Sequence, residues 1–227
     1  MLLKTAPEDP FELFKVWYAE AAGVCPENLS LLGKLWFYTK KPLRKLISKV
    51  YPPISMHQPD AMVISTSNSE GQPSSRVVLL KGFDERGVIF YTNYLSRKGR
   101  ELESNPKASA LFHWGQPERQ VRIEGVVEKV PYEESSQYWS SRARGSQVSG
   151  FASPQSEKVP DRNWLVAKVQ QVRQEHEEKE IPCPHFWGGY VLRPRKVEYW
   201  EGRANRFHDR ILYEKNNGQW SKSRLAP

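Results

Sequence analysis

Residues 197–210 read VEYWEGRANRFHDR, and this stretch constrains the fold more tightly than any other part of the chain. Its first part alternates as a β-strand does, with Val197 and Tyr199 on one side. Gly202 then marks a turn, and apolar residues resume at Ile211. The stretch therefore predicts a β-hairpin.

The second part of the stretch carries three cationic or titratable groups at every second position. Arg206, His208 and Arg210 would share one face of a strand. A solvated strand face is one interpretation of such a pattern. Because Tyr199 and Trp200 lie close by in the sequence, a site for a flat, anionic, conjugated ligand is the other.

The whole stretch resembles the C-terminal signature of the pyridoxamine 5'-phosphate oxidases. That signature runs Glu, aromatic residue, Trp, a variable segment, then Arg, apolar residue, His, Asp and Arg. The resemblance covers residues 9–26 and 60–227. It continues, in family order, in SRVVLLKGF at 75–83, YTN at 91–93, SRKG at 96–99, RQVRIEG at 119–125, SR at 141–142, GS at 145–146, QS at 155–156, WGG at 187–189 and RLAP at 224–227.

The resemblance implies a mainly β protein with flanking helices, an antiparallel split β-barrel that binds flavin mononucleotide (FMN). It implies a homodimer with FMN at the subunit interface. The implied activity is oxidation of the vitamin B6 phosphates pyridoxamine and pyridoxine 5'-phosphate to pyridoxal 5'-phosphate. The flavin would accept two electrons from the substrate, which amino-acid side chains cannot do. O2 would then reoxidise the flavin and be reduced to H2O2.

The same resemblance implies the roles of individual residues. The residues implied to bind FMN are Arg76, Val77, Val78, Leu79, Tyr91, Thr92, Arg97, Lys98, Gln120, Gln155, Ser156, Trp200 and Arg210. The residues implied to bind the substrate are Lys81, Tyr138, Arg142, Ser146, Arg206, Phe207 and His208. Of these, Arg206 and His208 are the implied catalytic residues.

The spacing of some of these residues carries information of its own. Tyr138 and Arg142 lie four apart on a predicted helix, hence on one face, and a Gly145-Ser146 loop follows. Together they form either a phosphate clamp or an ordinary surface contact. Lys81 ends a predicted strand and either reaches the same phosphate or faces solvent.

A second anion site is indicated at a helix N-terminus. Ser96 can cap a short helix whose first turn holds Arg97 and Lys98, where cations disfavour the helix unless an external anion binds. Val77–Leu79 would line the flavin or form part of the core.

Short strands joined by tight turns, with few crossover helices, predict an antiparallel barrel. Asp9-Pro10 opens the first predicted helix and Gly23 lies just past its end. Further helices are predicted at 96–103, 132–141 and 161–178. Strands are predicted at 61–67, 74–83, 88–93, 108–114, 120–130, 190–193, 196–200, 211–214 and 219–224.

Composition narrows the class of protein. A chain of 227 residues, 38% hydrophobic, suits one globular domain, 1–227. It has no bilayer-length apolar run and no secretory signal, so a cytoplasmic protein with reduced Cys25 and Cys183 is expected. No His or Cys cluster suggests a metal. The basic charge is concentrated in one segment, which argues against nucleic acid as the partner.

That segment, residues 27–58, is foreign to the family pattern and carries +5 of the net charge of +8. Leu43, Leu46, Ile47 and Val50 fall on one face of a short helix. A membrane surface or a partner groove is one interpretation. The other is a surface insertion, which costs little loop entropy.

Three departures from the family pattern bear on function. Glu201 adds a negative charge near the site, Phe207 replaces a smaller aliphatic residue, and no N-terminal arm is seen before the first helix. A catalytically weak carrier of FMN or pyridoxal phosphate is therefore an alternative function. A split-barrel flavin reductase is a third, which the segment 206–210 disfavours.

Overall fold

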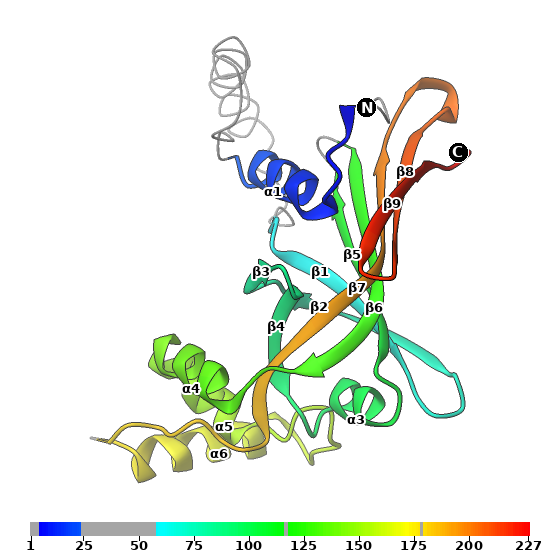
Figure 1. The fold of residues 1–227 in the computed structure, drawn as a ribbon. Coiled ribbons are helices and arrows are strands. Elements are labelled where there is room, and N and C mark those ends of the chain that lie inside the picture. The colour runs from blue at the N-terminus through cyan, green and yellow to red at the C-terminus, as the bar shows by residue number, and fades with distance from the viewer. Residues whose placement is uncertain (1–4, 24–57, 116–117, 178) are drawn as a thin grey trace. The chain divides into compact units, whose positions relative to one another are not determined.

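The computed structural model describes residues 5–23, 58–115, 118–177 and 179–227 (Figure 1). Apart from Gln58, the basic segment 27–58 lies outside them, as does Cys25. The elements are α1 Pro10–Ala21, β1 Ala61–Ser67, β2 Pro73–Leu79, β3 Gly82–Asp84, β4 Gly87–Asn93, α3 Arg97–Ser104, β5 Lys107–Trp114, β6 Arg119–Lys129, α4 Tyr132–Ser141, α5 Arg144–Ala152, α6 Arg162–Glu175, β7 Trp187–Glu201, η2 Ala204–Arg206, β8 Asp209–Asn216 and β9 Gln219–Arg224.

The strands form a sheet in the order β2-β1-β5-β6-β7-β4-β3, with β8 added to β7 and β9 added to β8. The registers of β3 on β4, β4 on β7, β7 on β8 and β8 on β9 are antiparallel. The fold is thus mainly antiparallel β with flanking helices, which confirms the predicted class.

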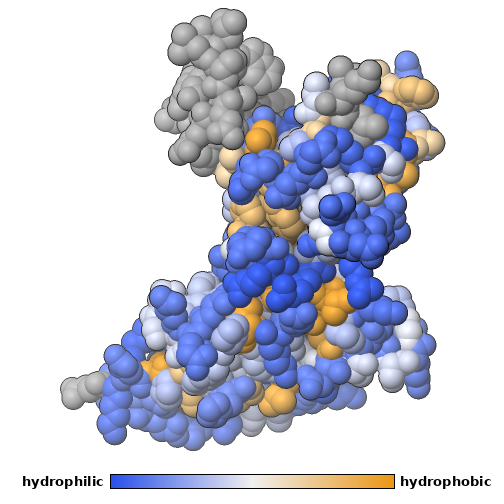
Figure 2. Space-filling view, in the orientation of Figure 1, coloured by the Kyte–Doolittle hydropathy of each residue, from blue (hydrophilic) through white to orange (hydrophobic). Residues whose placement is uncertain are grey.

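The chain divides into two compact units. We call Met1–Val63, Ala110–Ile123 and Arg195–Pro227 the terminal unit, and Ile64–Ser109 and Glu124–Pro194 the central unit. On the face shown in Figure 2, hydrophilic residues predominate and hydrophobic residues form separate patches. This agrees with the negative mean hydropathy of −0.69.

The terminal unit is built around α1. Asp9 accepts a hydrogen bond from the Phe11 N–H, so the predicted cap and the proline at the first helical position are confirmed. The ring of Phe14 lies edge-on to Phe112 of β5, with 5.1 Å between centroids. The helix start is also tied to β7, because the hydroxyl of Tyr199 donates to the Pro10 carbonyl at 2.5 Å.

The central unit packs α4, α5 and α6 with β7 around a second apolar cluster. Its buried members are Trp139, Val148, Val172, Ile181, Cys183 and Trp187. Cys183 is free and buried. The helix α4 lies close against β7 at Gly188, where a Cβ would come within 2.1 Å of the Tyr94 hydroxyl and 2.8 Å of Ser135 Oγ.

Several predicted elements differ in their boundaries. The strand predicted at 74–83 is two strands, β2 and β3, interrupted at Leu80–Lys81. The helix predicted at 161–178 begins as expected after Asp161, which accepts from the Trp164 N–H, but ends at Glu175. The strands predicted at 190–193 and 196–200 are one strand, β7.

Pro194 lies within β7, between the two strands that the sequence predicts. Proline cannot donate to a ladder, so it usually ends a central strand. Here the pairing with β4 ends at Leu192 and the pairing with β8 begins at Lys196. Pro194 lies between these two registers, so its missing N–H interrupts neither of them, while β6 is the further neighbour of β7.

Candidate functional site

The central unit contains a cavity of about 870 Å³, within the range of small-molecule sites. It brings together most of the residues that the sequence predicted. Those that line it are Arg76, Val77, Val78, Leu79, Lys81, Tyr91, Thr92, Arg97, Lys98, Tyr138, Arg142, Ser146, Gln155 and Ser156. The other predicted site residues, Gln120, Trp200, Arg206, Phe207, His208 and Arg210, belong to the terminal unit.

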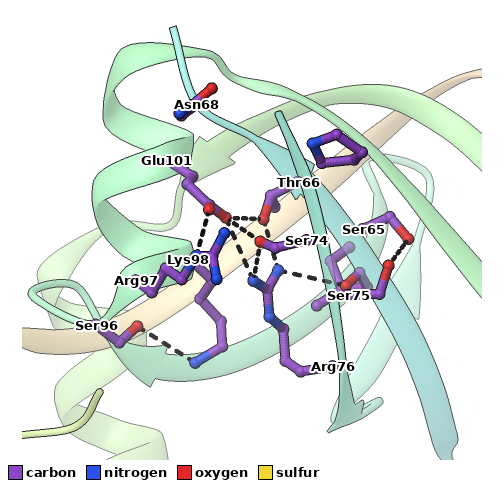
Figure 3. A network of polar contacts seen from close by, with 12 residues as sticks. Ser65, Thr66, Asn68, Ser74, Ser75, Arg76, Ser96, Arg97, Lys98 and Glu101 are labelled. Carbon is purple, nitrogen blue, oxygen red and sulfur yellow. Dashed lines mark hydrogen bonds and ion pairs between the residues drawn. The ribbon is translucent and has the colours of Figure 1, made fainter. Parts of the chain in front are cut away.

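Three cations gather at one part of the cavity, from β2 and the first turn of α3. Ser96 caps α3 through the Gly99 N–H, as predicted, so Arg97 and Lys98 begin the helix. Figure 3 shows Arg76 and Arg97 directed toward the same carboxylate, Glu101, and Lys98 turned toward Ser96.

Lys98 is a buried cation with neutral hydrogen-bond partners. Its Nζ donates to Thr92 Oγ1 at 3.0 Å, Gln155 Oε1 at 3.1 Å and Ser96 Oγ at 3.3 Å. Burial, and then the charge of Arg76, lower the pKa of Lys98 to about 8. A buried charge of this kind is stabilised when an anion binds beside it.

Glu101 is a site residue that the sequence analysis missed. Its carboxylate accepts from Thr66 Oγ1 at 2.5 Å, Ser74 Oγ at 2.6 Å and Arg97 Nε at 2.8 Å (Figure 3). Burial opposes its charge, but these bonds and the charge of Arg76 lower the pKa of Glu101 to about 2. The only sequence signal was its spacing of four residues from Arg97.

Arg142 lies among aromatic rings at another part of the cavity. Its guanidinium carbon is 4.8 Å from the Trp187 ring centroid and 5.1 Å from that of Trp139. Its Nη1 is buried and has no hydrogen-bond partner among the described residues. Burial lowers the pKa of Arg142, yet an arginine stays protonated in proteins. An unpaired buried donor suits a bound anion.

The geometry that joins Tyr138 to Arg142 differs from the prediction. Arg142 is not on the helix with Tyr138 but is the C-cap of α4, in extended conformation with ψ 145°. The chain then starts α5, so Gly145 and Ser146 lie in a helix and not in a loop. Both residues still line the cavity with Tyr138, whose ring stacks on Tyr91 at 4.0 Å.

In the terminal unit, the hairpin is confirmed and the alternation beyond it is wrong. β7 and β8 pair from Lys196↔Glu214 to Glu201↔Asp209. Arg206, however, lies in the short helix η2 with φ +61°, and it is not on a strand face with Arg210. The left-handed backbone at Asn205 and Arg206 breaks the period of two.

Arg210 is held by a buried carboxylate. Glu198 accepts from Arg210 Nε at 2.8 Å and from Arg122 Nη2 at 2.6 Å. Arg210 pairs across the strands with Trp200, and FMN is the predicted ligand of both residues. The charge of Glu201 is also compensated, because Arg119 and Arg203 both form ion pairs with it.

The sequence matches two family models. Residues 55–176 match the model described as pyridoxamine 5'-phosphate oxidase. Residues 187–227 match the pyridoxine 5'-phosphate oxidase C-terminal dimerisation region. The chain belongs to the pyridoxamine 5'-phosphate oxidase family. The expected resemblance is therefore confirmed.

Individual members of this oxidase family are similar over most of their length. The pyridoxine/pyridoxamine 5'-phosphate oxidase of Rubrobacter xylanophilus is 48% identical over 76% of this chain and 79% of its own. That of Salinibacter ruber is 43% identical over 97% of this chain and 90% of its own.

Two solved structures share the fold. PhzG from Burkholderia lata, in complex with tetrahydrophenazine-1-carboxylic acid, has 29% identity and a TM-score of 0.79, covering 99% of this chain and 95% of PhzG. A pyridoxamine 5'-phosphate oxidase-related, FMN-binding protein from Nostoc punctiforme has 17% identity and a TM-score of 0.61, covering 88% of this chain and all of its own. The architecture is thus that of the FMN-binding split barrels.

The described residues contain neither a candidate membrane span nor a candidate metal site. None of the helices found there combines the length and the apolar character needed to cross a membrane. In the same residues, no group of three or more His, Cys, Asp or Glu side chains is placed to hold a metal ion.

Proposed function

We propose that the chain is an FMN-dependent oxidase that converts pyridoxamine 5'-phosphate and pyridoxine 5'-phosphate to pyridoxal 5'-phosphate. O2 is the electron acceptor and is reduced to H2O2, and the amine substrate also takes up water and releases ammonia. The observation that carries the proposal is one cavity with two sets of cationic side chains, around Lys98 and around Arg142, in a member of this family. A phosphorylated cofactor and a phosphorylated substrate need two such sets.

The central unit fits the phosphate of FMN. Lys98 is a buried cation with neutral partners, and Arg76 and Arg97 are held beside it by Glu101. These residues would hold the phosphate, while Val77–Leu79, Tyr91 and Thr92 would contact the flavin. Val77 is an apolar residue that is 64% exposed, and a bound flavin would cover its side chain. Bound FMN would supply the two-electron acceptor that side chains lack.

The second cationic set fits the phosphate of the substrate. Arg142 offers an unpaired donor, and Lys81, Tyr138 and Ser146 line the same cavity. In the terminal unit, Arg206 would cover the pyridine ring and His208 would hydrogen-bond its phenolic oxygen. The match of residues 187–227 to a dimerisation region supports a homodimer, in which we expect FMN to contact both chains.

The similarity to PhzG supports a second candidate, oxidation of a tricyclic carboxylic acid. The ligand in that structure has no phosphate. The unpaired Arg142 and its neighbours favour a phosphate ester in this chain. A catalytically weak carrier of FMN or pyridoxal phosphate is the third candidate, and the rate of substrate oxidation distinguishes it from the oxidases.

The decisive experiment is a flavin spectrum of the purified protein. We expect a yellow protein that releases FMN on denaturation. Under anaerobic conditions, pyridoxamine 5'-phosphate should bleach the flavin absorbance, and air should restore it with formation of H2O2. A protein that cannot be reconstituted with FMN would end the oxidase proposal, and one that binds FMN without bleaching would be a carrier.

Replacing Arg142 tests the substrate. Arg142→Ala should raise KM by roughly 10- to 150-fold, since a charge-assisted hydrogen bond contributes about 1.5–3 kcal/mol, and leave kcat nearly unchanged. Arg144→Ala is the matched control, because Arg144 Nη1 donates to the Lys179 carbonyl on the surface. Unphosphorylated pyridoxamine should be equally poor for Arg142→Ala and the unaltered enzyme. Equal loss with both substrates would exclude the phosphate role.

A further inference from the structure

The loop end of the β7–β8 hairpin brings two carboxylates together. Glu201 and Asp209 are the last paired residues before the loop 202–208. Like charges directly opposite each other destabilise a pair of strands. The loop between Glu201 and Asp209 contains Arg206 and His208. Repulsion between the two carboxylates would therefore change the positions of both residues.

Arg203 bridges the two carboxylates from within the loop. Its Nη2 lies 2.8 Å from Glu201 Oε2, and its Nε lies 2.8 Å from Asp209 Oδ2. Arg119 and Arg224 bind the remaining oxygens from outside, at 3.1 and 2.6 Å. Hydrogen bonds from Arg224 and Arg203 hold the pKa of Asp209 well below its usual range.

The loop that Arg203 closes is strained. Asn205 and Arg206 are consecutive residues with φ of +58° and +61°, and neither is glycine. Such conformations persist where neighbouring contacts enforce them. Arg203 spans both ends of the loop, while the Gly202 N–H donates to the Glu118 carbonyl at 2.8 Å.

The backbone of Arg203 also contacts the imidazole of His208. The Arg203 N–H donates to His208 Nδ1 at 3.2 Å. The ring lies 4.6 Å from the Trp200 indole. A neutral imidazole that accepts at Nδ1 must carry its proton on Nε2. The ring then has one N–H donor, at Nε2, for a ligand.

We propose that Arg203 is a positioning residue for His208. Its side chain bridges Glu201 and Asp209 and, with Arg119 and Arg224, neutralises the pair, which keeps the loop closed and its own N–H on His208 Nδ1, so that neutral His208 presents Nε2–H. The inference rests on the proposed function only in taking His208 as a residue that contacts substrate.

The tautomer can be measured without cofactor or substrate. Two-bond proton–nitrogen spectra of ¹⁵N-labelled protein, recorded with the imidazoles neutral, identify the protonated nitrogen of each of the five histidines. His208→Gln assigns the signal. We expect Nε2–H in the unaltered chain and an averaged signal of both tautomers in Arg203→Ala.

Two further variants isolate the cause. Glu201→Gln combined with Arg203→Ala removes the repulsion that Arg203 offsets, so it should return the signal toward Nε2–H. Lys196→Ala is the matched control, because Lys196 and Glu214 form an ion pair at 2.8 Å in the same strand pair, at the end away from the loop. It should leave the His208 signal unchanged.

Activity supplies the second readout. Arg203→Ala should lower kcat about tenfold, the equivalent of one oriented hydrogen bond, and the double variant should recover part of it. Nδ1–H in the unaltered chain, an unchanged tautomer in Arg203→Ala, or an equal change in Lys196→Ala would each overturn the inference. Loss of FMN binding or oxidation with Nε2–H intact would overturn the proposed function alone.

Discussion

At the scale of single residues, Lys98 shows how the fold prepares a site for an anion. Its ammonium group is buried against the hydroxyls of Thr92 and Ser96 and the amide oxygen of Gln155. Burial and then the charge of Arg76 lower the pKa of Lys98, and the charge of Glu101 only partly offsets them. Without a ligand, Lys98 therefore loses its proton more easily than an exposed lysine does.

This predicts a pH dependence of FMN binding. The flavin phosphate is a dianion above its second pKa of about 6, so it binds best to protonated Lys98. Affinity should be constant between about pH 6 and about pH 8, where the pKa of free Lys98 lies, and then fall by up to about tenfold per pH unit until the pKa of Lys98 in the complex is reached. The affinity is measured by titrating FMN into cofactor-free protein at each pH and following the quenching of flavin fluorescence.

The comparison uses two lysine variants. Lys98→Met should bind FMN weakly with no such slope. Lys129→Met should keep the slope, because Lys129 pairs with Glu103 on the surface of the same unit. An affinity that stays flat to about pH 9.5 in the unaltered chain would contradict the role assigned to Lys98.

At the scale of elements, α4 has to be held in place because it brings Tyr138 to the cavity. Arg86, in the turn between β3 and β4, binds Asp84 at 2.8 Å and Glu134 of α4 at 2.9 Å. Ser135 accepts from the Gly189 N–H of β7 at 3.1 Å, and the Trp139 indole donates to the Ile181 carbonyl at 2.8 Å. Three contacts, each to a different segment, thus set the position of the helix.

Removing Arg86 should destabilise the protein. Arg86→Ala leaves two partly buried carboxylates without their shared partner, and we expect the free energy of unfolding to fall by about 1–3 kcal/mol. Arg193→Ala breaks an exposed pair with Glu128 and should cost about 0–1 kcal/mol. Urea unfolding midpoints at constant slope measure both. Equal losses would show that Arg86 acts only as a surface charge.

At the scale of the whole molecule, the family models cover residues 55–176 and 187–227. The segment 27–58 overlaps them only at its end. It lies outside the described residues except for Gln58, so its assignment as an insertion stays a prediction. We expect its flanks, Cys25-Pro26 and Pro59-Asp60, to correspond to neighbouring residues in a shorter relative.

Deletion of residues 27–58 should therefore leave a folded dimer that binds FMN. Loop-closure entropy depends only weakly on loop length, so shortening a surface connection changes the free energy of unfolding little. Light scattering gives the mass, and flavin absorbance gives the FMN content. Aggregated or colourless protein would place the segment in the core. Liposome binding by the full chain, lost on deletion and weakened by salt, would assign it to a membrane surface.

The sequence alone determined the features that depend on neighbours along the chain. Asp9-Pro10 and Ser96 start their helices where predicted, because a cap needs only residues a few positions away. The hairpin at residues 197–213 follows from alternation and a turn. Most of the cavity lining came from family resemblance, which carries information about tertiary contacts that spacing does not.

The tertiary structure decided what depends on distant residues. From the sequence, Glu101 is expected to lie on the surface of a helix. In the structure, Thr66 of β1 and Ser74 of β2 donate hydrogen bonds to it, and it is buried between the cations of the site. Arg206 alternates with Arg210 in the sequence, but contacts between the ends of the loop place it in a left-handed turn. Local sequence patterns do not predict such contacts, because the interacting groups are far apart in the sequence and come together only when the chain folds.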